Sequence, residues 1–247
     1  MRRRSLFLIL LFETAAVSGS TLNVYPLKIL LSRRDRSSSL SITNAGKEAT
    51  AVQITVKKWQ QDIQGIDSFA DTDDVVFFPK IVTVPPGQKQ IIRVGLRTLR
   101  DDPAVETSYR LFVDELPVNP SANGVRMTLR LAVPLFASPA RPSKNGAIDS
   151  VSIRNDQMTI VVRNGGNSHA HISSMTVIAA DARRAQVFRT ERRDLYVLAA
   201  SVRAFTLKVP SGLCGAVASV RVWVDLGGVQ LYKEEPRDAV CVARPAT

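Results

Sequence analysis

A strand-like alternation near the middle of the chain constrains the fold more than any other feature of the sequence. Residues 125–137 read VRMTLRLAVPLFA, in which every odd position from Val125 to Leu135 is apolar and the first even positions are arginine or threonine. A period of two is typical of a β-strand with one buried face and fits no helix. Because proline cannot donate a hydrogen bond to a neighbouring strand, Pro134 predicts that this strand lies at a sheet edge.

A long apolar edge attracts strands from other chains, and proteins normally blunt it. An edge that is left open suggests that pairing with a foreign strand is its purpose. An ordinary core-facing strand is the alternative, but Pro134 and the long loop 116–124 favour the edge. The side chains that such a donor strand would offer to a partner share one face, and they are Val125, Met127, Leu129 and Leu131.

The rest of the chain consists of short alternating segments separated by glycine, proline, asparagine and aspartate, without a convincing run of helical period. The sequence therefore predicts an all-β protein. Seven segments precede a stretch rich in proline, serine and basic residues at 136–146, and seven is the strand count of an immunoglobulin-like sandwich. A second set follows it. The predicted strands are 22–31, 38–43, 50–59, 75–84, 89–97, 108–115 and 125–137, then 148–154, 157–163, 171–179, 202–209, 217–226 and 229–233.

The N-terminus reads MRRRSLFLILLFETAAVSGS, in which three arginines precede a short apolar core and then small residues. This order is typical of an export signal, whereas a helix that begins the folded domain is the alternative. The apolar core is too short for a membrane span, and we predict no integral membrane segment after signal removal. We therefore expect a signal peptide at 1–20, one immunoglobulin-like domain at 21–138 and a second at 139–247.

The chain is strongly basic, with a formal net charge of +11. Removing residues 1–20 takes away three arginines and one glutamate, so the charge of the exported protein falls only to +9. Such a charge suits nucleic acid, an anionic surface or an acidic protein. The arginines are scattered along alternating strands with few aromatic residues between them, so we predict no nucleic-acid partner.

The two cysteines, Cys214 and Cys241, both lie in the second predicted domain. In an exported protein they predict a disulfide bond, with a reduced buried pair as the alternative. Closing a loop of this length would stabilise the fold by roughly 3 to 4 kcal/mol through chain entropy.

Several segments of the chain occur together in a characteristic order. The most specific is a Pro-Gly-Gln turn that leads into IIRV and is followed by YRLFVDELP, and RNGGNSHAHI at 163–172 is its weaker counterpart in the second domain. The first-domain segments are LNVYPLKILLS (22–32), SITNAG (41–46), FFPKIVTVPPGQKQIIRVG (77–95), SYRLFVDELP (108–117) and RLAVPLFASP (130–139). In these segments the chain resembles the periplasmic pilus-assembly chaperones of the chaperone-usher pathway, the PapD-like family.

The resemblance implies a boomerang of two sandwiches in the periplasm. The seventh strand of the first sandwich would be lent to a pilus subunit that lacks its own last strand, and the complex would be delivered to an outer-membrane usher. SYRLFVDELP and RLAVPLF are most similar to the archaic branch of the family, whose subunits resemble spore-coat protein U.

The resemblance also implies an anchor for the carboxylate at the end of the subunit. In the best-known branch, a basic residue on the first strand and a lysine on the seventh form this anchor. Lys28 aligns with the first, but Pro134 holds the place of the lysine. We therefore predict that Arg110 is the main anchor, ahead of Arg130 and Lys28, although a surface arginine without a role is the alternative for the two arginines.

Other patterns give little support for chemistry. His169 and His171 could share a strand face and hold a metal, but no third ligand is identifiable, so we predict no metal and no cofactor. The sequence has no nucleophile elbow, phosphate loop or metalloprotease motif, and we expect no enzymatic activity. Trp59 and Trp223 are interpreted as core residues of their domains. An exported immunoglobulin-like adhesive or binding module is the alternative function.

Overall fold

The structure is a computed structural model that describes residues 21–97, 104–117 and 127–241 of the 247-residue chain. The predicted signal peptide and Val125 therefore lie outside the described residues. Antiparallel strands make up nearly all of the regular structure, and the two short helices have four residues each. The predicted all-β fold is confirmed.

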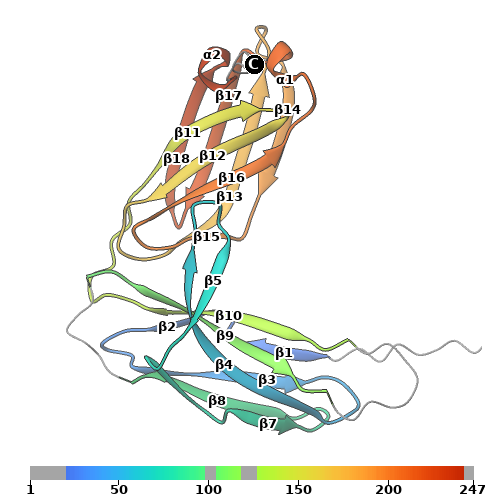
Figure 1. The fold of residues 1–247 in the computed structure, drawn as a ribbon, viewed down its shortest axis with the longest axis vertical. Helices are drawn as coiled ribbons and strands as arrows, with labels where there is room; N and C mark the ends of the chain where they lie inside the picture. The colour runs from blue at the N-terminus through green and yellow to red at the C-terminus, as the bar shows by residue number, and fades with distance from the viewer. Residues whose placement is uncertain (1–20, 98–103, 118–126, 242–247) are drawn as a thin grey trace, which may run out of the picture.

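The first ten strands form two sheets around one core (Figure 1). Valine, leucine and isoleucine point inward from both sheets, because the alternating pattern places them on the facing sides. One sheet has the order β1 (Leu22–Tyr25), β3 (Ser37–Asn44), β8 (Lys89–Leu96) and β6 (Val75–Phe78). The other has the order β2 (Ile29–Leu31), β10 (Arg130–Ala137), β9 (Thr107–Glu115), β4 (Thr50–Gln61) and β5 (Asp67–Asp71), and β7 (Ile81–Val84) also pairs with β4.

The remaining strands form a second pair of sheets with a separate core. Figure 1 shows this second sandwich rising at an angle from the first, so the predicted boomerang of two sandwiches is confirmed. One sheet has the order β11 (Gly146–Arg154), β12 (Gln157–Asn164) and β16 (Ser201–Lys208). The other has the order β14 (Gln186–Arg192), β13 (Ala170–Ala180), β17 (Ser219–Leu226) and β18 (Val229–Pro236), and β15 (Leu195–Val197) also pairs with β13.

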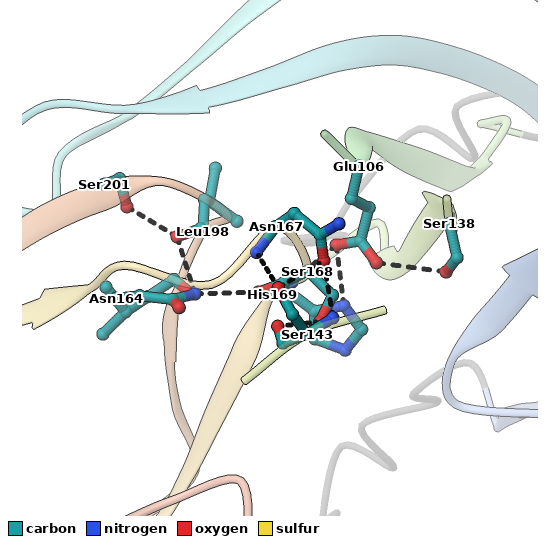
Figure 2. Close-up of polar contacts among 10 residues, drawn as sticks. Glu106, Ser138, Ser143, Asn164, Asn167, Ser168, His169, Leu198 and Ser201 are labelled. Atoms are coloured by element: carbon teal, nitrogen blue, oxygen red, sulfur yellow. Dashed lines mark hydrogen bonds and ion pairs between the residues drawn. The ribbon is translucent and has the colours of Figure 1, made fainter. Parts of the chain in front are cut away.

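Each sandwich contains a buried asparagine whose side chain forms hydrogen bonds to backbone groups at a turn. The buried side-chain amide of Asn44 donates to the carbonyl oxygens of Glu48 (2.7 Å) and Val84 (2.9 Å). Asn164 does the same in the second sandwich, donating to the carbonyls of Ser168 (2.8 Å) and Leu198 (3.0 Å; Figure 2). Each asparagine also accepts a hydrogen bond from the backbone two residues later. The asparagine amide thereby supplies hydrogen bonds to buried backbone carbonyls.

The far end of the second sandwich carries the disulfide. Cys214 in α1 (Leu213–Ala216) is bonded to Cys241, which follows α2 (Arg237–Val240), and their Cα atoms are 5.8 Å apart. The predicted pairing is confirmed.

Two predicted strands differ from the structure, and three observed strands were not predicted. The predicted strand 22–31 is two strands in different sheets, and 75–84 is also two, because Pro26 and Pro79 interrupt the ladders. The strands β5, β14 and β15 were not predicted from the sequence. β5 and β14 lie largely in solvent, so they have no buried face and no apolar alternation, and β15 has only three residues.

The interpretation of both tryptophans was wrong. Trp59 is 2 % exposed, but it packs with Phe136 and Leu198 in a cluster between the two sandwiches and not in the first core. Trp223 lies partly exposed on the outer face of its sheet, where its ring contacts that of Tyr232 at 5.3 Å between centroids. An aromatic residue in an alternating strand therefore does not identify which face is inward.

Candidate partner-binding site

Strand β10 has an open edge over its first half. It pairs with β9 along its whole length, whereas β2 covers only Leu135–Ala137. Within the described part of the chain, the segment from Arg130 to Pro134 therefore has a strand neighbour on one side only. The predicted sheet edge lies in this segment, and its main chain offers hydrogen-bonding groups to an added strand.

The apolar row changes from exposed to buried as it approaches this edge. Met127 is 74 % exposed, Leu129 and Leu131 are partly buried against the first core, and Val133 is fully inside it. The β9–β10 ladder extends to Leu129, whose backbone carbonyl accepts a hydrogen bond from Glu115 N–H (2.9 Å). The described members of the predicted donor row thus run from an exposed position at Met127 to the core at the start of the open edge.

Arg110 lies on the outer face of this sheet, opposite Pro134. Its guanidinium stacks on Trp59, 3.7 Å from the ring centroid, and the side chain is only 15 % exposed. Burial lowers the pKa of Arg110, and the neighbouring Asp67 charge opposes that shift. A partly desolvated guanidinium is well suited to a carboxylate ligand, because hydrogen bonds and charge are stronger there than in water.

Arg130 has a different environment. It is 68 % exposed, stacks over Phe112 and forms a two-pronged ion pair with Asp114, in which Nη2 lies 3.2 Å from Oδ2. The hydrogen bonds to Asp114 raise the pKa of Arg130. Its guanidinium is therefore already occupied by a carboxylate of the same hairpin.

In the structure Lys28 and Arg110 flank Pro134 from opposite sides, whereas Arg130 lies further along β10. Lys28 precedes Ile29, the partner of Leu135, so exposed Lys28 lies beside Pro134 on the side opposite Arg110. Arg130 is four residues from Pro134 along β10, which is about 13 Å. One carboxylate over Pro134 could therefore be approached by Arg110 and Lys28 together, but not by Arg130.

The other end of β10 reaches the second sandwich. The ring of Phe136 is fully buried and stacks on His169, with 3.6 Å between centroids and 8° between planes. Trp59, Leu198 and Tyr196 complete the cluster. The same strand thus carries an open edge at one end and an interdomain contact at the other.

A buried carboxylate links the two sandwiches beside this cluster (Figure 2). Glu106 Oε1 accepts a hydrogen bond from the backbone N–H of His169 (2.8 Å) and lies 2.8 Å from its Nδ1, and Oε2 accepts one from Ser138 Oγ (3.1 Å). The Glu106 backbone N–H also donates to the Asn167 carbonyl (2.9 Å). Sequence reasoning missed Glu106, since a lone glutamate just before a strand gives no signal.

The two histidines do not converge on one point. His169 is held by Glu106, whereas His171 Nε2 lies 3.4 Å from Asp194 Oδ1. Among the residues that the structure describes, no three histidine, cysteine, aspartate or glutamate side chains are grouped to hold a metal ion. No helix in residues 21–97, 104–117 and 127–241 is long and apolar enough to cross a membrane.

Two immunoglobulin-like sandwiches set at an angle, with an open apolar strand edge on the first, define the class of assembly chaperones that act by strand pairing. Residues 21–143 match the family model described as pili and flagellar-assembly chaperone, PapD N-terminal domain. The chain belongs to the PapD-like family of assembly chaperones. Comparison with curated proteins found no match.

Solved structures share the fold over most of both chains. One is the CsuC–CsuE chaperone–tip adhesion subunit pre-assembly complex from archaic chaperone-usher Csu pili of Acinetobacter baumannii, with 22% identity, 87% of this chain and 97% of that chain covered, and a TM-score of 0.60. The YadV chaperone has 16% identity, 87% and 98% coverage and a TM-score of 0.60. The Salmonella enterica SafA pilin complex with the SafB chaperone has 13% identity, 88% and 98% coverage and a TM-score of 0.56.

Proposed function

We propose that this protein is a non-enzymatic chaperone of the periplasm, which binds a pilus subunit by donor-strand complementation and delivers it to an outer-membrane usher. The observation that carries the proposal is the open edge of β10 with its apolar row. Membership of the PapD-like family supports it, and so does the fold shared with solved chaperone–subunit complexes. The domain limits 21–138 and 139–247 and the signal peptide at 1–20 belong to the same proposal.

The donor strand supplies what the subunit lacks. Its main chain pairs with the exposed edge of the subunit, while Val125, Met127, Leu129 and Leu131 fill a groove as alternate side chains. At about 25 cal/mol per Å² of apolar surface, four such side chains contribute several kcal/mol before ordering costs. Covering the groove also prevents the subunit from aggregating through it.

The anchor fixes the register of the incoming strand. We propose that Arg110 binds the terminal carboxylate of the subunit, with Lys28 on the other side of Pro134 and Arg130 as a weaker contact further along the strand. Arg110 supports this role best, because it is held by Trp59 and is partly desolvated. The sequence similarity to the archaic branch makes a subunit of the spore-coat protein U type the expected partner.

Co-expression with the subunit of the same assembly system tests the proposal. We expect Met127→Asp or Leu129→Asp to leave the chaperone folded and to abolish recovery of soluble complex, since an unpaired carboxylate is prohibitive in an apolar groove. Thr128→Asp is the matched control, because it places the same charge on the opposite side of the segment. Normal complex yield with both row variants would contradict strand donation and favour an adhesive module, which would bind a sugar or a surface without a subunit.

A further inference from the structure

The hairpin of β4 and β5 projects beyond the first sandwich and contacts the second (Figure 1). In the turn between these strands, the carbonyl of Ile63 accepts a hydrogen bond from the backbone N–H of Ala204 (2.6 Å). Ala204 belongs to β16, which is the edge strand of its sheet. The hairpin turn therefore makes a backbone hydrogen bond to the edge strand of the second sandwich and brings its own side chains to the domain boundary.

Asp67 is the first residue of β5, and its carboxylate is held firmly. Oδ1 accepts hydrogen bonds from Trp59 Nε1 (2.8 Å) and Gln61 Nε2 (2.9 Å). Oδ2 lies 3.8 Å from Arg110 Nη2, which is an ion-pair distance but too long for a hydrogen bond. Asp67 thus compensates the charge of Arg110 without filling its hydrogen-bonding positions.

A second guanidinium comes from the other domain. Arg203 on β16 packs against Gly65 of the hairpin turn, where an added Cβ would lie 2.2 Å from its Nε. Its Nη1 donates to the Tyr196 carbonyl (2.6 Å), but its buried Nε has no hydrogen-bond partner among the residues that the structure describes. Burial lowers the pKa of both Arg110 and Arg203, and the charge of Asp67 opposes the shift in each.

Two guanidinium groups, one from each domain, lie near the carboxylate of Asp67. Arg110 is within ion-pair distance of this carboxylate, and the charge of Asp67 also opposes the burial shift in the pKa of Arg203. Other charged groups nearby are engaged elsewhere, since buried Glu106 is held by His169 and Ser138, Lys57 pairs with Asp71, and Asp194 faces His171. A partly desolvated guanidinium pair with an orphan donor favours the arrival of another anion.

We propose that Asp67 is a built-in counter-ion for the guanidinium groups of Arg110 and Arg203. A partner that bears a carboxylate must compete with the Asp67 carboxylate when it binds. Asp67 keeps Arg110 oriented on Trp59 and holds the hairpin at the domain boundary while no partner is bound. It also limits the affinity for the incoming carboxylate, so that a captured partner can be released. The identity of that carboxylate as the end of a pilus subunit rests on the proposed function.

Asp67→Asn tests the counter-ion in the free protein, since asparagine keeps the shape and can still accept from Trp59. The Tm of the variant and of the unchanged protein is measured in acetate and in chloride at equal ionic strength. We expect acetate to raise the Tm of Asp67→Asn by roughly 2 to 4 °C more than it raises that of the unchanged protein. Asp71→Asn is the matched control, because it removes the same charge from an exposed position on the same strand.

An equal acetate effect in all three proteins would overturn the proposal. A second measurement uses a peptide with the C-terminal sequence of the subunit, with its end either free or amidated. We expect Asp67→Asn to bind the free-ended peptide about tenfold more tightly than the unchanged protein does, with no gain for the amidated one. Equal gains for both peptides would also overturn it. Subunit recovery with Arg110→Ala tests the anchor separately, so failure of the counter-ion and failure of the proposed function can be told apart.

Discussion

Single residues carry the electrostatics of this protein, and one of them makes its stability depend on pH in the alkaline range. The hydroxyl of buried Tyr109 donates to Asp74 Oδ2 (3.0 Å). Burial, followed by the charge of Asp74 and this hydrogen bond, raises the pKa of Tyr109 above its ordinary value. Because the folded-state pKa is raised, its contribution to stability is fully present below the unfolded value of about 10 and is lost as pH rises above it.

Tyr109→Phe should therefore flatten the alkaline loss of stability. We expect the free energy of unfolding of the variant to fall less steeply between about pH 10 and pH 12 than that of the unchanged protein. Denaturant unfolding at several pH values provides the measurement. Part of the slope should remain, because burial also raises the pKa of Tyr196. Identical slopes in the two proteins would refute the assignment.

The proposed anchor is also tested at this scale. Arg110→Ala should reduce subunit recovery most, followed by Lys28→Ala and then Arg130→Ala, since truncating one partner of a buried charge pair costs roughly 2 to 5 kcal/mol. Subunit recovery is compared only among variants whose melting transition is the same as that of the unchanged protein. Normal recovery with Arg110→Ala alongside loss with Lys28→Ala would show that the first-strand residue is the main anchor.

The sequence could name Arg110, Lys28 and Arg130 because they stand inside segments that resemble a known family. It could not name Asp67, Glu106 or Arg203. Each is a lone charged residue, and its role depends on a partner that no short sequence pattern links to it. The contacts of Glu106 and Arg203 also cross between the domains, whose arrangement no local pattern encodes.

At the scale of elements, alternation located the strands that bury one face and missed those that do not. In β3, β4, β9 and β12, buried apolar residues alternate with more exposed ones over the middle of each strand, and the sequence predicted all four strands. In β5 all five residues are exposed, so its sequence lacks the apolar alternation of a strand with one buried face. This strand belongs to the hairpin that touches the second domain.

The hairpin turn should be sensitive to a single methyl group. Gly65 has a positive φ of 77° and faces the Arg203 guanidinium, so Gly65→Ala adds both backbone strain and a clash. We expect a loss of about 2 kcal/mol in the free energy of unfolding. Gly87→Ala is the control, because Gly87 has a similar φ of 69° and no atom near the added Cβ. An equal loss in both variants would mean that the contact with Arg203 contributes nothing.

At the scale of the whole molecule, the two sandwiches have separate cores and meet through a small boundary. Each core is closed by its own buried asparagine, and the disulfide belongs to the second sandwich alone. Stability is therefore distributed unequally between the two halves. A change at the disulfide should affect the second half and leave the first half largely as it was.

Removing the disulfide provides the corresponding prediction. The two cysteines are 27 residues apart, and closing such a loop stabilises a fold by about 3 to 4 kcal/mol through chain entropy. A variant with Cys214→Ala and Cys241→Ala should show this loss in denaturant unfolding, mainly in the second sandwich. Mass spectrometry of the exported protein checks the bond itself, and two free thiols would disprove it.

Strand β10 is also a mechanical element. Its open half would hold a partner, and Phe136 at its other half is wedged between the two sandwiches, about 20 Å away along one extended chain. A pull on a bound partner would therefore act on a strand that is paired with β9 along its whole length and that ends in the cluster between the two domains.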